Sequence, residues 1–128
     1  RRGFTRVLEL LLFVLYLSLG YDCFQDPLYY LFTGSLLEVA LMAVHACQMT
    51  GRDELAACYD MITRCGAKTL GLTEQYGLEV GKPANLIALE ADDAIAALRD
   101  RATIRHVLAQ GTRLVSTTAP MVTWQRSL

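Results

Sequence analysis

An apolar run of thirteen residues, VLELLLFVLYLSL over 7–19, places the strongest single restriction on the fold. A membrane-spanning helix needs about 20 apolar residues, so this run is too short to cross a bilayer. Glu9 interrupts it, and the Gly-Tyr-Asp sequence at 20–22 is not the cleavage site of a secretory signal. So much apolar surface is unfavourable in water and must be buried in the protein. We predict no membrane span, and a buried helix over 6–13 that leads into a buried strand over 15–20.

The composition is that of an apolar, nearly neutral chain that forms one domain or part of one. Its 128 residues are 53% hydrophobic and 20% charged, whereas soluble domains average roughly 45–50% and about 25%. This excludes intrinsic disorder, which requires low hydrophobicity and high charge. Twelve basic and 13 acidic side chains give a net charge of -1, so there is no basic surplus to bind a phosphate backbone. We therefore expect no nucleic-acid partner.

The four cysteines, at positions 23, 47, 58 and 65, do not form a recognisable site. No two of them are spaced as C-x-x-C, which argues against a zinc ribbon or a thioredoxin-like motif. The apolar content already suffices to build a core, so a disulfide framework is not needed. We predict small buried side chains in a reducing compartment, and hence a cytoplasmic protein.

Helix signals dominate the first part of the chain, up to residue 71. Ser35 followed by Glu38 is a capping box, which predicts a helix that ends near Gly51. Asp53 predicts the cap of a second helix, and Gly71 predicts the end of a third, shorter one. This part is therefore expected to be helical after the buried strand.

Beyond residue 71 the pattern becomes that of a β segment. Glycines and a proline punctuate the chain at 77, 81 and 83. The residues then predict a strand over 85–89, an amphipathic helix over 91–101, and a hairpin of strands 104–110 and 112–116 that turns at Gly111. We therefore divide the chain into 1–71, 72–118 and a tail over 119–128.

The second part contains a sequence pattern typical of the amidohydrolase superfamily. The sequence GLEVGKPANLI over 77–87 resembles its C-terminal signature, which is Gly, three residues, Gly-Lys-x-Ala-Asp-Leu and then a strand. The sequences IRHV over 104–107 and GTRLV over 111–115 resemble the closing hairpin of the same superfamily. The sequence AKTLGL over 67–72 resembles the helix that precedes the signature.

The first part is similar to the cytosine and isocytosine deaminases of that superfamily. The sequence GYDCFQDPLY over 20–29 resembles their Gly-His-Asp-Asp-x-x-Asp-Pro-Trp-Tyr loop. Further similar stretches are RRGFTRV over 1–7, GSLLEV over 34–39 and HACQM over 45–49. The resemblance spans 1–118 and implies an α/β fold. It would comprise the last strand of a (β/α)8 barrel, the helices after it, and the closing strands of a small β-sandwich domain.

The resemblance also implies a chemistry centred on Asp22. Family members hold a divalent metal, zinc or iron, that activates a water for attack on a cytosine-like pyrimidine. Asp22 stands where their last barrel strand supplies a catalytic aspartate that ligates the metal and takes the water's proton. Cys23 replaces the second Asp of the loop motif, and Leu28 replaces the Trp beside the substrate. We therefore expect Cys23 and Leu28 to be substrate-binding positions, with the identity of the pyrimidine left open.

The remaining metal ligands of the family do not occur in this sequence. They include a His-x-His pair, whereas the two histidines here, His45 and His106, lie sixty-one residues apart. Neither histidine has a partner at ligand spacing, so both are expected to be structural. One carboxylate cannot hold a catalytic metal by itself. We predict that this chain alone binds no metal and does not deaminate its substrate.

Two hypotheses follow for what the chain does. In the first, it is the C-terminal portion of a hydrolytic deaminase that works only with the missing half of the barrel. In the second, it is a non-catalytic module, natural or engineered, that associates with further copies of itself. The second rests on bulky apolar residues where the family carries charged or small ones, such as Leu8, Leu12 and Phe13. Charged replacements at Leu12 and Phe13 would then dissociate the assembly.

Overall fold

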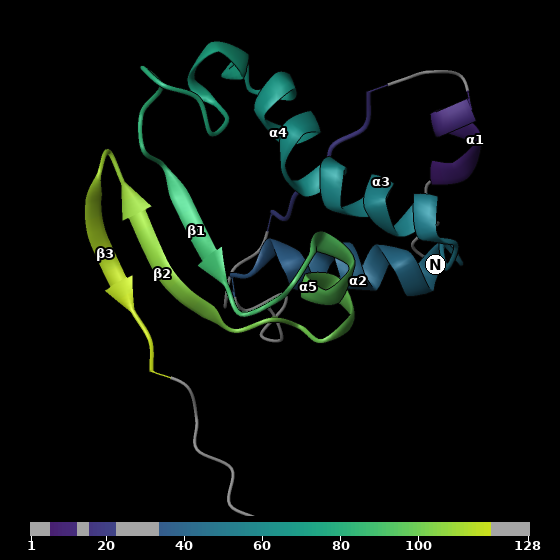
Figure 1. Cartoon of the computed structure of the whole chain (residues 1–128). Helices are drawn as coiled ribbons and strands as arrows, with labels where there is room; N and C mark the ends of the chain where they lie inside the picture. The colour runs from purple at the N-terminus through teal and green to yellow at the C-terminus, as the bar shows by residue number, and fades with distance from the viewer. Residues whose placement is uncertain (1–5, 13–15, 23–33, 119–128) are drawn as a thin grey trace, which may run out of the picture.

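The computed structural model describes residues 6–12, 16–22 and 34–118 of the chain. Its elements are α1 (Val7–Leu12), α2 (Leu36–Ala46), α3 (Arg52–Ile62), α4 (Arg64–Thr69), the 3-10 helix η1 (Thr73–Gln75), β1 (Leu86–Leu89), α5 (Ala94–Arg99), β2 (Ile104–Ala109) and β3 (Thr112–Ser116). Figure 1 shows the three strands side by side, with α2, α3 and α5 grouped beside them. None of these helices is long and apolar enough to span a membrane, over the residues that are described.

The core lies among the helices and draws on both parts of the chain. Its buried side chains come from α1, α2, α3, α5 and the α2–α3 connection: Val7, Ala40, Val44, Met49, Cys58, Met61 and Leu98. The helix α5, which belongs to the predicted β segment, packs against α2 and α3 (Figure 1). The side chain of Leu98 is 1% exposed. The core therefore joins the predicted segments 1–71 and 72–118 through α5, and the division at residue 71 stays a prediction.

The strand predicted over 15–20 is wrong for the described residues 16–20, which form no strand. Burial does alternate along them, because Leu17 and Leu19 pack against the core while Tyr16 and Ser18 are exposed. The backbone N–H of Leu19 donates to the carbonyl of Met61 at 3.0 Å, at the end of α3 rather than on a strand. The two-residue period therefore reflects burial of alternate side chains without a β ladder.

The helix predicted from Ser35 begins there as expected, but its capping bond and its end need correction. Ser35 is the N-cap, but its side chain makes no capping hydrogen bond; its backbone carbonyl accepts from Glu38 N–H at 3.1 Å. The helix ends at Ala46 rather than near Gly51. Gln48 then adopts a left-handed φ of 56°, and Met49 N–H donates to the Val44 carbonyl at 2.9 Å. This is the Schellman arrangement, in which one left-handed residue ends a helix.

This left-handed position yields a stability prediction. We expect Gln48→Gly to raise the free energy of unfolding by about 0.5–1 kcal/mol, because glycine adopts positive φ without a steric penalty. Thermal unfolding followed by circular dichroism measures the change. Gln48→Ala is the matched control, since it removes the side chain but keeps the penalty. An equal rise in both variants would show that the backbone conformation is not the cause.

Gly51 begins α3 instead of ending α2, and Asp53 is not the cap. Gly51 has an extended φ of -69° at the N-cap, and its N–H donates to Glu54 Oε2 at 2.7 Å. Asp53 lies in the first turn of α3. Negative charge is favourable there because it faces the positive end of the helix dipole.

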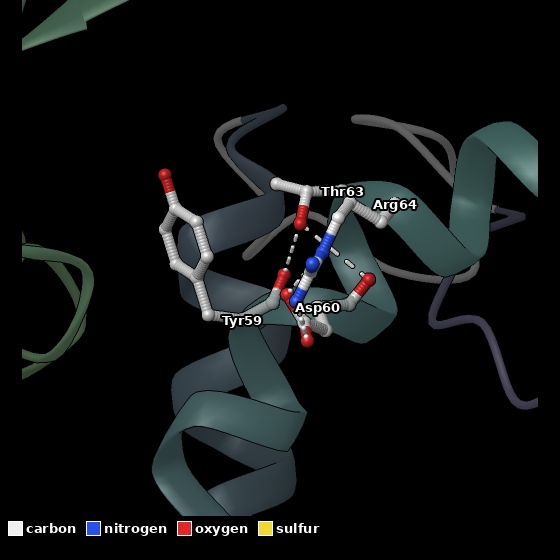
Figure 2. A network of polar contacts seen from close by, with 4 residues as sticks. All are labelled: Tyr59, Asp60, Thr63 and Arg64. Carbon is white, nitrogen blue, oxygen red and sulfur yellow. Dashed lines mark hydrogen bonds and ion pairs between the residues drawn. The ribbon is translucent and has the colours of Figure 1, made fainter. Parts of the chain in front are cut away.

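A break at Thr63 separates α3 from α4. Thr63 has φ -122° and ψ -97°, outside the helical range, and its Oγ1 donates to the Tyr59 carbonyl at 2.7 Å (Figure 2). A hydroxyl that bonds back to the preceding turn bends a helix. Across the break, Arg64 Nε donates to Asp60 Oδ1 at 3.0 Å. The second and third predicted helices are therefore α3 and α4, and their boundary lies at Thr63.

The sheet confirms the predicted hairpin. It is antiparallel with the order β1-β2-β3. The turn between β2 and β3 consists of Gln110 and Gly111, with φ of 49° and 79°. Two consecutive left-handed residues are typical of a type I′ turn, whose twist matches that of the strands. The predicted helix over 91–101 is shorter, because Asp93 accepts from Ala96 N–H at 2.7 Å and begins α5 there.

Candidate functional site

Asp22 lies at a bend that ends the described segment 16–22, and its side chain is exposed. Three contacts hold the backbone that leads to it. Leu17 and Leu19 pack against the core, and Leu19 N–H bonds to the end of α3. Lys68 Nζ, on α4, lies 3.0 Å from the ring centroid of Tyr16, a cation–π contact. Contacts with α3 and α4 therefore position the backbone that carries the carboxylate of Asp22.

The exposed carboxylate of Asp22 fits one oxygen ligand of a divalent metal. Zinc sites take about four ligands from cysteine, histidine and carboxylate side chains. No group of three such side chains converges among the described residues. The other predicted site residues, Cys23 and Leu28, lie outside the described residues. Further ligands would have to come from outside the described part of the chain.

The two histidines lie on different elements of the fold. His45 is exposed on α2, and His106 is half-buried in β2. The Nδ1 atom of His106 is buried and has no hydrogen-bond partner among the described residues. Neither histidine belongs to a metal-binding group there. The structural roles of both histidines stay predictions.

The polar residues of the sequence signature stabilise local structure. Lys82 Nζ donates to the Tyr76 carbonyl at 2.8 Å and lies 3.3 Å from Glu79 Oε2. Asn85 Oδ1 accepts from the backbone N–H of Gln110 at 2.8 Å, at the tip of the hairpin. The signature thus ties the loop before β1 to the β2–β3 turn. Sequence reasoning missed this role, although the amide of Asn85, where the family has Asp, is a side chain typical of turns.

Cys58 behaves as a buried apolar side chain, as predicted for the cysteines, whereas Cys47 and Cys65 are only partly buried. Cys58 is fully buried on α3, and its thiol donates to Met49 Sδ at 3.7 Å. Burial, with smaller contributions from the negative charges of Cys47 and Glu54, raises the pKa of the Cys58 thiol from 9.0 to about 11. A thiol is nucleophilic only as the thiolate, so Cys58 is not a catalytic nucleophile at neutral pH.

The raised pKa of Cys58 predicts a loss of stability at high pH. The unfolded chain loses this proton near pH 9, whereas the folded chain keeps it up to about pH 11. The free energy of unfolding should therefore fall between these values, by up to about 2 kcal/mol. Denaturant unfolding at pH 8, 9, 10 and 11 measures the fall, and Cys58→Val should flatten it. The same slope in both proteins would assign it to other groups.

Comparison with known proteins decides the family. The model of the amidohydrolase family matches residues 1–115. The chain belongs to the amidohydrolase family. It is 34% identical to 5-methylcytosine deaminase from Klebsiella pneumoniae in two solved structures. The first, liganded with phosphonocytosine, covers 96% of this chain at a TM-score of 0.88. The second, liganded with 5-fluorocytosine, covers 97% at a TM-score of 0.89.

A characterised relative of this amidohydrolase chain supports the same family. N-isopropylammelide isopropyl amidohydrolase of Pseudomonas sp. (strain ADP) is 32% identical over 82 residues, which are 64% of this chain. The chain spans 20% of the length of that enzyme and 30% of the Klebsiella deaminase. The predicted resemblance to cytosine-deaminase-like amidohydrolases is thus confirmed. The related structures share the arrangement of helices and antiparallel sheet described above.

Proposed function

We propose that this chain is the C-terminal portion of a hydrolytic deaminase that acts on a cytosine-like pyrimidine. The observation that carries the proposal is the match to 5-methylcytosine deaminase, at 34% identity and a TM-score of 0.88 over 96% of this chain. The segment 16–22 would then occupy the place of the last barrel strand, and 72–118 would close the small β-sandwich domain. The thiols of Cys47, Cys58 and Cys65 are free, which suits the reducing cytoplasm.

In this proposal Asp22 is the residue that this chain contributes to catalysis. A bound zinc or iron would supply a water activated at neutral pH. The exposed carboxylate of Asp22 would ligate the metal, orient the water and hold its proton for transfer to the leaving amine. Asp22 suits these roles because contacts with the core, α3 and α4 hold the segment before it while its side chain stays accessible. Cys23 and Leu28 follow it along the chain and are proposed to contact the pyrimidine.

The test is a chimera in which this chain replaces the matched 30% of the Klebsiella deaminase. We expect the chimera to bind one divalent metal and to release ammonia from 5-methylcytosine or cytosine. Metal analysis and an ammonia assay measure both, and this chain alone should show neither. A folded chimera that binds metal but deaminates no pyrimidine would contradict the proposal.

The second candidate function is a self-associating module without catalysis. It is favoured by apolar side chains more than a third exposed on the first helices, namely Leu8 on α1 and Leu36 and Met42 on α2. Surfaces of this kind mark sites of association. Native mass spectrometry of the chain alone distinguishes the candidates. A metal-free oligomer that Leu8→Lys dissociates would favour this module, whereas a monomer would contradict it.

A further inference from the structure

The segment from α4 to β1 carries the densest group of exposed apolar side chains in the described part of the chain. Twelve large hydrophobic residues in the described part of the chain are more than a third exposed, and five of them fall within 70–80: Leu70, Leu72, Tyr76, Leu78 and Val80. The side chains of Leu78 and Val80 are 84% and 108% exposed, so they touch almost nothing. Apolar groups gathered in this way mark interaction sites more often than chance exposure. We name the segment 70–82 the signature loop.

Polar contacts of one lysine and the conformations of two glycines hold the signature loop in shape. Lys82 Nζ donates to the carbonyls of Tyr76 at 2.8 Å and Thr73 at 3.5 Å, and it pairs with Glu79 at 3.3 Å. Gly77 and Gly81 have φ of 118° and 93°, values that other residues rarely adopt. A loop already ordered loses little entropy when a partner binds. Its backbone therefore presents Leu78 and Val80 in a fixed position.

The comparisons indicate which partner this loop meets. This chain retains the structure of the Klebsiella deaminase over 96% of its own length, yet it corresponds to only 30% of that enzyme. The relative therefore holds more than twice as much further polypeptide, which is available to cover the corresponding surfaces. A loop with an ordered backbone and solvent-exposed apolar side chains is the kind of surface that this further polypeptide would cover. Exposed Glu74 precedes the two barest apolar side chains, which suits a partner surface with a basic group at its rim.

We propose that the signature loop is a docking surface for the remaining portion of a cytosine-deaminase-like amidohydrolase, with Leu78 and Val80 inserted into an apolar site on it. This inference rests on the proposed function, because it takes the partner from the same enzyme. It holds whether that portion lies on the same polypeptide or on another. It assigns the polar signature residues Lys82 and Glu79 the role of presenting the two anchors.

The experiment co-expresses a tagged form of this chain with the complementary 70% of the Klebsiella deaminase and quantifies the part that co-purifies. We expect the double variant Leu78→Lys/Val80→Lys to reduce co-purification at least about tenfold, since each anchor would lose its burial. Leu114→Lys is the matched control, because Leu114 in β3 is 64% exposed. Circular dichroism of the tagged chain checks folding, and Leu70→Lys provides the same test if the double variant unfolds. Unchanged co-purification, or an equal loss in the control, would overturn the proposal.

The fused chimera separates this inference from the proposed function. Deaminase activity in the chimera without co-purification of the wild-type pair would overturn the docking surface and leave the function standing. Co-purification that depends on Leu78 and Val80, with an inactive chimera, would leave the docking surface standing and overturn the function. A homo-oligomer of this chain alone that the double variant dissociates would overturn the inference in favour of a second copy.

Discussion

Asp22→Asn in the chimera is expected to lower kcat/KM for pyrimidine deamination by at least about 10³-fold. The substitution keeps the shape of the side chain but removes its negative charge and its ability to accept a proton. Both properties are needed if this carboxylate ligates the metal and takes the proton of the water. Ammonia release measures the rate, and metal analysis of the same preparation shows whether the site has also lost affinity for the ion.

Asp92→Asn is the matched control for this prediction. Asp92, like Asp22, is an exposed aspartate at a bend, but it lies in the connection between β1 and α5. Activity should stay within about twofold of the parent chimera. If Asp22→Asn left the activity at the level of the control, Asp22 would be a turn residue without a catalytic role. Equal circular dichroism spectra of the two variants would confirm that any difference comes from the chemistry.

Leu98→Ala is expected to destabilise the chain by about 2–5 kcal/mol, the largest stability effect that we predict. Leu98 is 1% exposed and belongs to the core formed with α2 and α3. Truncation removes three buried carbon atoms and leaves a cavity at the contact that joins the two parts of the chain. The midpoint of thermal unfolding should fall by roughly 8–20 °C. Circular dichroism at 222 nm follows the transition.

The control for this prediction is Leu114→Ala. It truncates another leucine side chain, but one that is 64% exposed in β3. Its effect should be no more than about 0.5 kcal/mol, because little apolar surface returns to water. A fall in the midpoint of similar size in both variants would mean that α5 does not contribute to the core. A loss of the α2 and α3 helices that leaves the hairpin intact would show that the two parts unfold separately.

Local signals predicted the elements whose structure depends on neighbouring residues in the sequence. The hairpin at Gly111 is one, because a type I′ turn needs two residues with positive φ and the strands beside it alternate. The end of α4 at Gly71 is another, since Gly71 has a φ of 69° and Leu72 N–H bonds back to the Ala67 carbonyl at 2.8 Å. Both structures are closed by hydrogen bonds over a few residues.

The errors arose where a local pattern fitted two structures. Alternating leucines over 16–20 suit a strand, but a strand also requires a neighbouring strand, and Leu19 bonds to the end of α3 instead. A glycine such as Gly51 is common at either end of a helix. Here it begins α3, because the side chain of Glu54, three residues later, accepts a hydrogen bond from its backbone N–H. Gln48 shows no preference for positive φ in the sequence. It adopts this conformation because the chain must reverse direction after α2 for the side chain of Met49 to be buried in the core.

The sequence by itself determined the family, the position of Asp22 in its motif, the apolar excess and the closing hairpin. These depend on residue identity and on contacts between neighbours along the chain. Only the tertiary structure decided that Lys82 and Asn85 of the signature support a loop and a turn, and that Leu78 and Val80 stand exposed. It also decided that α5 joins the core of α2 and α3. Burial and long-range hydrogen bonds join residues far apart in the chain, so no local pattern specifies them.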